Sequence, residues 1–117
     1  MGASAPIFFA GDEMRVTNKY RAQPVRDEDG YFASKKEHRQ WQVLKLRERA
    51  GEISNLERQV RFRFEHNGIH ICDYVADFVY FEAMCRVVCD VKGFVTPEFK
   101  LKAKMMKAFY NINVETV

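Results

Sequence analysis

Residues 34–50 carry the clearest helical pattern in the chain. Trp41 and Leu44 lie about one turn apart among basic side chains, which is the spacing of an amphipathic helix. Ser34 and Glu37 have the spacing of a capping box, in which each side chain hydrogen-bonds the backbone of the other residue. Glu37 also stands one turn before Trp41, so it is expected on the inward face of the helix. The predicted buried stripe is Trp41, Val43, Leu44, Leu46 and Ala50.

A second helix is predicted over residues 97–110. Thr96 is a preferred N-cap residue, and Pro97 suits the first helical position because its missing N–H group would have no partner there. Residues 111–117 alternate with period two and predict a closing strand. One side of the helix, called the lysine face below, consists of Lys100, Lys104 and Lys107. A solvated surface and a contact along a nucleic-acid backbone would both explain this face.

Three strands are predicted between the two helices. Residues 59–65 alternate strictly between apolar and polar side chains. Asn67-Gly68 is a preferred two-residue hairpin turn, so the chain is expected to return as a second strand. Residues 82–86 form the next hairpin connection and lead into a third strand. Residues 53–59 are interpreted as a connection between the first helix and the first strand.

The predicted order of elements is therefore α-β-β-β-α-β. The strand–helix–strand unit from residue 86 onward implies a right-handed parallel crossover, which makes the sheet mixed. The predicted fold class is α/β in the α+β sense, a mixed four-stranded sheet flanked by two helices. Residues 18–117 are long enough for one domain with one modest core, and residues 1–17 are expected to form an N-terminal arm.

Two aspartates interrupt the most apolar strands. Asp77 lies within Val-Ala-Asp-Phe-Val, and Asp90 follows Cys89 in an equally apolar run. Residues two apart in a strand point to the same face, so Lys92 is expected beside Asp90. Such charges in apolar surroundings cost stability unless they are paired or bind a charged ligand. A cross-strand ion pair between Asp77 and Lys92 is one explanation. A site for Mg²⁺, which binds through one or two carboxylates, together with a phosphate is the other.

Composition narrows the choice of function. The chain has 117 residues, 47% of them hydrophobic, and a net charge of +3, which permits nucleic acid as a partner without requiring it. It has no apolar run of about 18 residues, so no membrane span is expected. The cysteines show no paired motif, which fits a reducing compartment. A zinc site can be written from His66, His70 and Cys72 with Cys85 or Cys89, but the spacing matches no standard finger.

The combination of motifs resembles the PD-(D/E)XK nuclease superfamily. It is closer still to a phage-associated family of unknown-function domains that is placed in that superfamily. The resemblance covers residues 18–117, and it implies a restriction-endonuclease-like core. Its motifs are Phe-Ala-Ser-Lys-Lys-Glu at 32–37, Leu-Glu-Arg-Gln-Val-Arg-Phe at 56–62, Tyr-Val-Ala-Asp-Phe at 74–78 and Asp-Val-Lys-Gly from residue 90.

The resemblance also implies roles for individual residues. Asp77 would match the first aspartate of the motif, Asp90 its second acidic residue and Lys92 its lysine. Glu37 resembles the helix glutamate of the branch that includes Holliday-junction resolvases. The three carboxylates would hold the metal, and Gln59 would support these ligands without binding the metal itself.

The implied activity is that of a DNA endonuclease that depends on Mg²⁺ or Mn²⁺ and needs no small-molecule cofactor. Branched or double-stranded DNA is the expected substrate, and a homodimer is expected because resolving a junction takes two cuts. The resemblance places the protein in the cytoplasm of a bacterial host if a phage encodes it. The alternative is a DNA-binding or regulatory protein on a nuclease scaffold that is inactive alone, since fold does not guarantee chemistry. The expected DNA contacts are Lys36, Lys100, Lys104 and Lys107.

Overall fold

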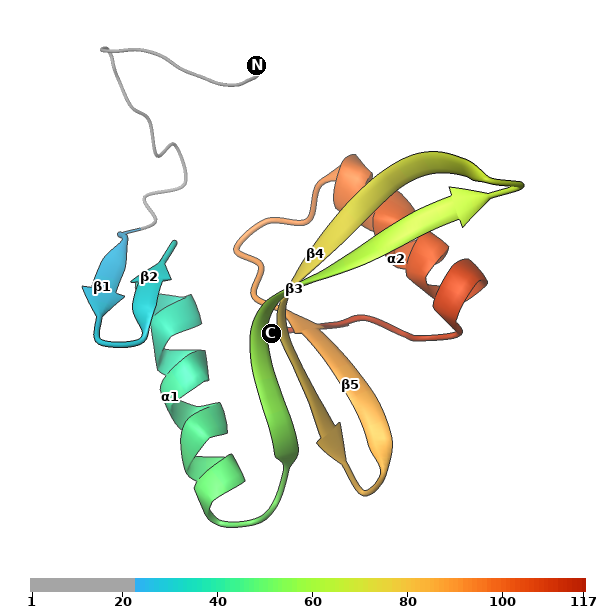
Figure 1. The fold of residues 1–117 in the computed structure, drawn as a ribbon. Helices are drawn as coiled ribbons and strands as arrows, with labels where there is room; N and C mark the ends of the chain where they lie inside the picture. The colour runs from blue at the N-terminus through green and yellow to red at the C-terminus, as the bar shows by residue number, and fades with distance from the viewer. Residues whose placement is uncertain (1–22) are drawn as a thin grey trace, which may run out of the picture. The chain divides into compact units, whose positions relative to one another are not determined.

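The computed structural model describes residues 23–117 (Figure 1). The predicted N-terminal arm, residues 1–17, lies outside the described residues. The chain divides into two compact units, one that ends at His38 and one that runs from Arg39 to Val117. In chain order the elements are β1 (Val25–Asp27), β2 (Gly30–Phe32), α1 (Lys35–Arg49), β3 (Ser54–His66), β4 (Ile69–Glu82), β5 (Cys85–Asp90), α2 (Pro97–Tyr110) and β6 (Glu115–Thr116).

The first unit contains a small antiparallel hairpin of β1 and β2 that the sequence pattern did not reveal. At its turn, Asp27 accepts a hydrogen bond from the backbone N–H of Asp29. The other carboxylate oxygen of Asp27 lies 2.6 Å from Nε2 of His38, and this hydrogen bond lowers the pKa of Asp27 below its ordinary value. The ring of His38 also packs edge-on against the buried Phe32. These contacts tie the hairpin to the first turn of α1.

The second unit is built on a mixed sheet with strand order β3-β4-β5-β6. The first two pairings are antiparallel and the β5–β6 pairing is parallel. The predicted class, with two helices, a mixed four-stranded sheet and the order α-β-β-β-α-β, is confirmed. Two boundaries were wrong: β3 already begins at Ser54, in the segment interpreted as a connection, and the closing strand is limited to Glu115–Thr116.

Both hairpin turns of this sheet use residues with positive φ. Asn67 and Gly68, with φ of 52° and 78°, make the predicted turn between β3 and β4. The turn between β4 and β5 has the same form but uses Ala83 and Met84, with φ of 51° and 67°. Side chains that carry a Cβ and cannot hydrogen-bond their own backbone are disfavoured in this region. The second turn is therefore strained where the first is not.

The sheet is covered on both faces, so the unit has two hydrophobic clusters. Phe78 and Val79 are neighbours on β4, yet they belong to different clusters, which explains why β4 contains a continuous buried run. The α2-side cluster is Phe62, Phe64, Tyr74, Ala76, Val79, Val88 and Met106. The α1-side cluster is Leu44, Ile53, Phe78, Tyr80 and Cys89. Figure 1 shows how the long β3–β4 hairpin reaches both helices.

The helices follow their predicted limits, but α1 buries a narrower stripe than expected. Leu44 is fully buried, whereas Val43 and Leu46 are 49% and 59% exposed because they fall outside the stripe that faces the sheet. At the start of α2, the Thr96 side chain accepts the predicted hydrogen bond from the N–H of Phe99 at 3.1 Å. No helix within residues 23–117 combines the length and the apolar character that crossing a membrane requires.

Candidate functional site

Asp77 lies on β4 and connects three strands through its carboxylate. Its Oδ2 accepts a hydrogen bond from the backbone N–H of Val91, just beyond the end of β5, at 2.9 Å. Its Oδ1 accepts one from Nε2 of Gln59 on β3 at 3.2 Å. Gln59 has a positive φ of 52° within a strand, a conformation that costs free energy in most residues. The family resemblance implied a supporting role for Gln59, and the structure places it beside Asp77.

Asp90 ends β5 and is almost completely buried, with 2% of the residue exposed. Its Oδ2 accepts a hydrogen bond from the hydroxyl of Tyr74 at 2.8 Å and lies 3.2 Å from Nζ of Lys92. Lys92 also lies over the ring of Phe99, 4.5 Å from its centroid. The predicted proximity of Asp90 and Lys92 is therefore confirmed. Lys92 therefore forms an ion pair with Asp90, and the ion pair with Asp77 stays a prediction.

The backbone around Asp90 is held from both sides. On one side, β5 pairs with β4, and the Asp77 carboxylate accepts a hydrogen bond from the N–H of Val91. On the other side, β6 pairs with β5 so that Asp90 lies beside Thr116. Val117 extends this pairing, since its N–H donates to the carbonyl of Asp90 at 3.0 Å and its carbonyl accepts from the N–H of Lys92 at 3.2 Å. The segment that carries Asp90 and Lys92 is consequently fixed in position.

A polar cavity of about 490 Å³ opens in front of Asp90 and Lys92. One wall is the start of α2, where Lys102 forms an ion pair with Glu98 at 3.1 Å. The opposite wall comes from β3 and β4. Both positive and negative side chains line the cavity, so a ligand would meet both donors and acceptors. The lining residues are Arg61, Asp73, Tyr74, Val75, Asp90, Lys92, Thr96, Glu98, Phe99 and Lys102.

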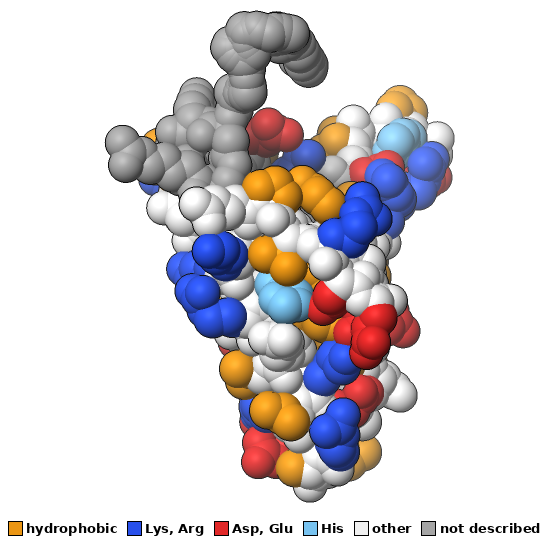
Figure 2. Space-filling view, turned by 90° about the vertical axis from the view of Figure 1, so that its left-hand side faces the viewer, with side chains coloured by type: hydrophobic (Ala, Val, Ile, Leu, Met, Phe, Trp, Pro, Cys, Tyr) orange, Lys and Arg blue, Asp and Glu red, His pale blue; other side chains and the backbone are white. Residues whose placement is uncertain are grey.

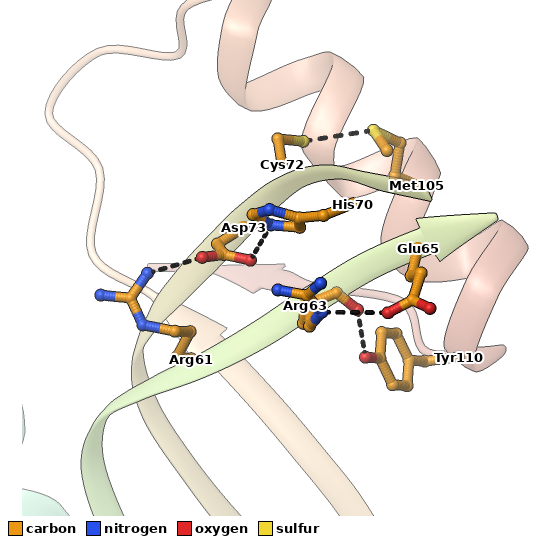
Figure 3. Close-up of polar contacts among 8 residues, drawn as sticks. All are labelled: Arg61, Arg63, Glu65, His70, Cys72, Asp73, Met105 and Tyr110. Carbon is orange, nitrogen blue, oxygen red and sulfur yellow. Dashed lines mark hydrogen bonds and ion pairs between the residues drawn. The ribbon is translucent and has the colours of Figure 1, made fainter. Parts of the chain in front are cut away.

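A hydrogen-bonded chain of side chains lies at the rim of this cavity (Figure 3). The Asp73 carboxylate lies 2.9 Å from Nη1 of Arg61 and 2.8 Å from Nε2 of His70. The bond to His70, followed by the one to Arg61, lowers the pKa of Asp73 below its ordinary value. His70 thus pairs with a carboxylate at the surface.

The lysine face of α2 does not line this cavity, and Lys36 and Glu37 belong to the first unit. Glu37 is in the first unit and is 6% exposed, and its backbone N–H donates to Oγ of Ser34 at 3.1 Å. This bond is the serine half of the predicted capping box. Lys36 and the lysine face of α2 are exposed. The roles of Glu37 as a metal ligand and of these lysines as DNA contacts stay predictions.

Within residues 23–117, no three His, Cys, Asp or Glu side chains are grouped closely enough to hold a metal ion. The zinc site written from His66, His70 and the cysteines is therefore not formed by the described part of the chain. Cys89 points into the α1-side cluster, where burial in the first place raises the pKa of its thiol to about 11. The thiol is protonated at neutral pH and is a poor metal ligand in that state.

The comparison with family models identifies the chain. Residues 17–117 match the family described as "Protein of unknown function (DUF1064)". The chain belongs to the DUF1064 family. No curated protein and no solved structure matches it. The family match spans both aspartates, Lys92 and the whole sheet, so the site described above lies entirely within the DUF1064 domain.

Sequence reasoning missed Tyr74, Arg61 and Asp73 as neighbours of the DUF1064 site. Tyr74 is the first residue of the motif at 74–78. Its contact with Asp90 depends on how β4 and β5 pack against each other, which the periodicity of the sequence does not reveal. One signal was available. A tyrosine in a buried strand needs a partner for its hydroxyl, and a buried carboxylate on the neighbouring strand is the obvious acceptor.

Proposed function

We propose that this protein is a metal-dependent DNA endonuclease of the PD-(D/E)XK superfamily. The observation that carries the proposal is the convergence of Asp77, Asp90 and Lys92 on the end of β5, beside a polar cavity. Two carboxylates on adjacent strands, with an ammonium group just beyond the end of β5, are groups that phosphodiester hydrolysis with a divalent cation can use. Asp90 is 2% exposed, and burying a carboxylate so completely is costly for a merely structural ion pair.

Asp77 and Asp90 fit a Mg²⁺ or Mn²⁺ ion. Mg²⁺ sites in proteins use one or two carboxylates and complete their coordination with waters and substrate phosphates. Asp90 makes both of its hydrogen bonds through Oδ2, so Oδ1 lies outside them. Glu37 is the predicted third ligand. A bound ion would polarise the phosphate and lower the pKa of a coordinated water.

The protein's own side chains supply orientation and charge. Lys92 lines the cavity, and its ammonium group would stabilise negative charge that develops on the phosphate. The hydrogen bonds of Asp77 to Val91 and Gln59 keep its carboxylate in one orientation. Such positioning contributes to catalysis because the reacting groups need not be ordered again at each turnover.

DNA would be held by local basic groups. Figure 2 shows one face of the molecule, on which Lys and Arg side chains are interspersed with Asp and Glu. A small net charge of +3 agrees with that mixed pattern. We therefore assign backbone contacts to Lys36 and the lysine face, and we propose selection of DNA by shape, with branched DNA as the preferred substrate and a homodimer as the active form.

One observation favours the alternative function, a DNA-binding or regulatory protein that is inactive alone. The described residues contain no group of three metal ligands, and Lys92 already neutralises Asp90. A partner or the DNA itself would then have to complete the site. This alternative predicts binding of junction DNA without cleavage.

The deciding experiment incubates supercoiled plasmid and four-way junction DNA with the protein and Mg²⁺, Mn²⁺ or EDTA. We expect cleavage that EDTA abolishes and that Asp90→Asn and Lys92→Ala remove. Lys45→Ala is the matched control, because it deletes the same charge from a lysine that lies over the Trp41 ring and not at the cavity. Failure to cut any substrate with either metal would reject the enzyme, and junction binding without cleavage would support the alternative. Sedimentation at micromolar concentration, with and without junction DNA, tests the dimer.

A further inference from the structure

Tyr74 is a buried polar side chain next to the proposed site whose role the proposed function leaves open. It lies on β4, is 4% exposed and belongs to the α2-side cluster. Its ring packs between those of Phe62 and Phe99, at centroid distances of 6.4 and 6.2 Å. Because the ring is buried among these neighbours, the core places its hydroxyl before any ligand binds.

That hydroxyl donates a hydrogen bond to Oδ2 of Asp90 at 2.8 Å. A carboxylate oxygen can only accept, so the tyrosine hydroxyl is the donor of this bond. Lys92 contacts the same oxygen at 3.2 Å. Two donors from different segments thus converge on one oxygen of a carboxylate that is itself 2% exposed.

We propose that Tyr74 is a positioning residue that fixes the rotation of the Asp90 carboxylate and presents Oδ1, and not Oδ2, to the divalent cation. The proposal rests on the proposed function, because it assigns the way in which that metal site is organised. It also implies that Asp90 binds through a single oxygen.

The physical basis is the freedom that an unsupported carboxylate would have. Without the Tyr74 hydroxyl, Lys92 alone would hold Oδ2, and its flexible side chain can follow the carboxylate as it turns. The cation would then have to order Asp90 on binding. Loss of a hydrogen bond that orients a metal ligand typically lowers metal affinity or activity by about 10–100-fold.

The test compares Tyr74→Phe with Tyr80→Phe. Tyr80 lies on the same strand, is 5% exposed and packs in the α1-side cluster, so its substitution also removes one hydroxyl from a buried ring. Calorimetry measures Mn²⁺ affinity of each folded protein, and steady-state cleavage of four-way junction DNA gives kcat and KM. We expect Tyr74→Phe to bind Mn²⁺ about 10–100-fold more weakly. Its kcat should fall at limiting Mn²⁺ and recover at high Mn²⁺, with KM for DNA unchanged, while Tyr80→Phe behaves as wild type.

A second comparison uses Asp90→Asn as background. If Tyr74 acts through Asp90, adding Tyr74→Phe to Asp90→Asn should not weaken Mn²⁺ binding further. Wild-type affinity in Tyr74→Phe, or an equal loss in Tyr80→Phe, would overturn the role of Tyr74 and leave the proposed function standing. Mn²⁺ binding by wild type without cleavage of any DNA would reject the nuclease, yet the affinities would still decide the role of Tyr74. A wild-type protein that does not bind Mn²⁺ at all would overturn both.

Discussion

Replacing Asp77 with asparagine sets two electrostatic effects against each other. Neutralising Asp77 relieves its repulsion with the nearby Asp90 carboxylate, which by itself would stabilise the metal-free fold. The same change weakens two hydrogen bonds, one from the N–H of Val91 at 2.9 Å and one from Gln59 at 3.2 Å. Asparagine offers a single acceptor oxygen. If that oxygen keeps the hydrogen bond from the Val91 N–H, the NH₂ group of the asparagine faces the NH₂ group of Gln59, and two donors cannot bond to each other.

The hydrogen bonds should decide the outcome. Bonds to charged groups contribute about 1.5–3 kcal/mol and those between neutral groups about 0.5–1.5 kcal/mol. Gln59 can turn its amide to restore one bond, so we expect Asp77→Asn to lower the free energy of unfolding by about 1 kcal/mol. Asp77→Ala should cost more, because the Val91 N–H loses its acceptor, which costs about 1–3 kcal/mol when the group is shielded from water.

Urea unfolding in EDTA measures both variants against wild type. Glu65→Gln is the control, since it neutralises a carboxylate whose partner, Arg63, lies at the surface, and it should change stability by less than about 0.5 kcal/mol. An Asp77→Asn protein that is at least as stable as wild type would show that repulsion dominates. Equal stability of the Asn and Ala variants would show that the Val91 bond contributes nothing. We also expect Asp77→Asn to lose cleavage and keep DNA binding.

Three further predictions concern other parts of the second unit. Changing Ala83 and Met84 to Asn-Gly should raise the free energy of unfolding by about 1–2 kcal/mol, measured by urea unfolding, because these residues tolerate positive φ. Replacing the lysine face by alanine should flatten the log–log salt dependence of DNA binding by up to about 0.9 per lost contact; an unchanged slope would make the face a solvated surface. NMR titration should give Asp73 a pKa below its ordinary value, and His70→Ala should raise that pKa. The stabilisation from the Asp73–His70 pair is present above the pKa of Asp73 in the unfolded state. It is lost as the pH falls through the pKa of Asp73 in the folded state.

Local chemistry was enough to predict much of the fold. The Thr96 cap, the Pro97 start and the Asn67-Gly68 turn depend on neighbours in sequence, and each is found where it was predicted. Elements without such a signal were missed. Strands β1 and β2 have three residues each, too few for a period to show, and the start of β3 is polar because it lies at the edge of the sheet.

The sequence predicts only those contacts of the site that lie along a single strand. Alternation along one strand places Lys92 beside Asp90, and this follows from sequence alone. The bond from Tyr74 to Asp90 and the bond from Val91 to Asp77 depend on the relative shift and twist of β4 and β5. Those quantities are set by packing against both helices, so no count of residues along the chain supplies them.

The backbone hydrogen bonds on both sides of the Asp90 segment have a consequence for the order in which the molecule folds. Asp77 and Val91 are joined through a hairpin, whose ends meet early because little chain entropy is lost in closing it. The bonds from Val117 to Asp90 and Lys92 close a much longer loop that contains all of α2. Non-local pairings of this kind form slowly. We therefore expect the β3–β4–β5 meander to become protected from hydrogen exchange first, and the strand end that carries Asp90 to become rigid only when α2 has docked.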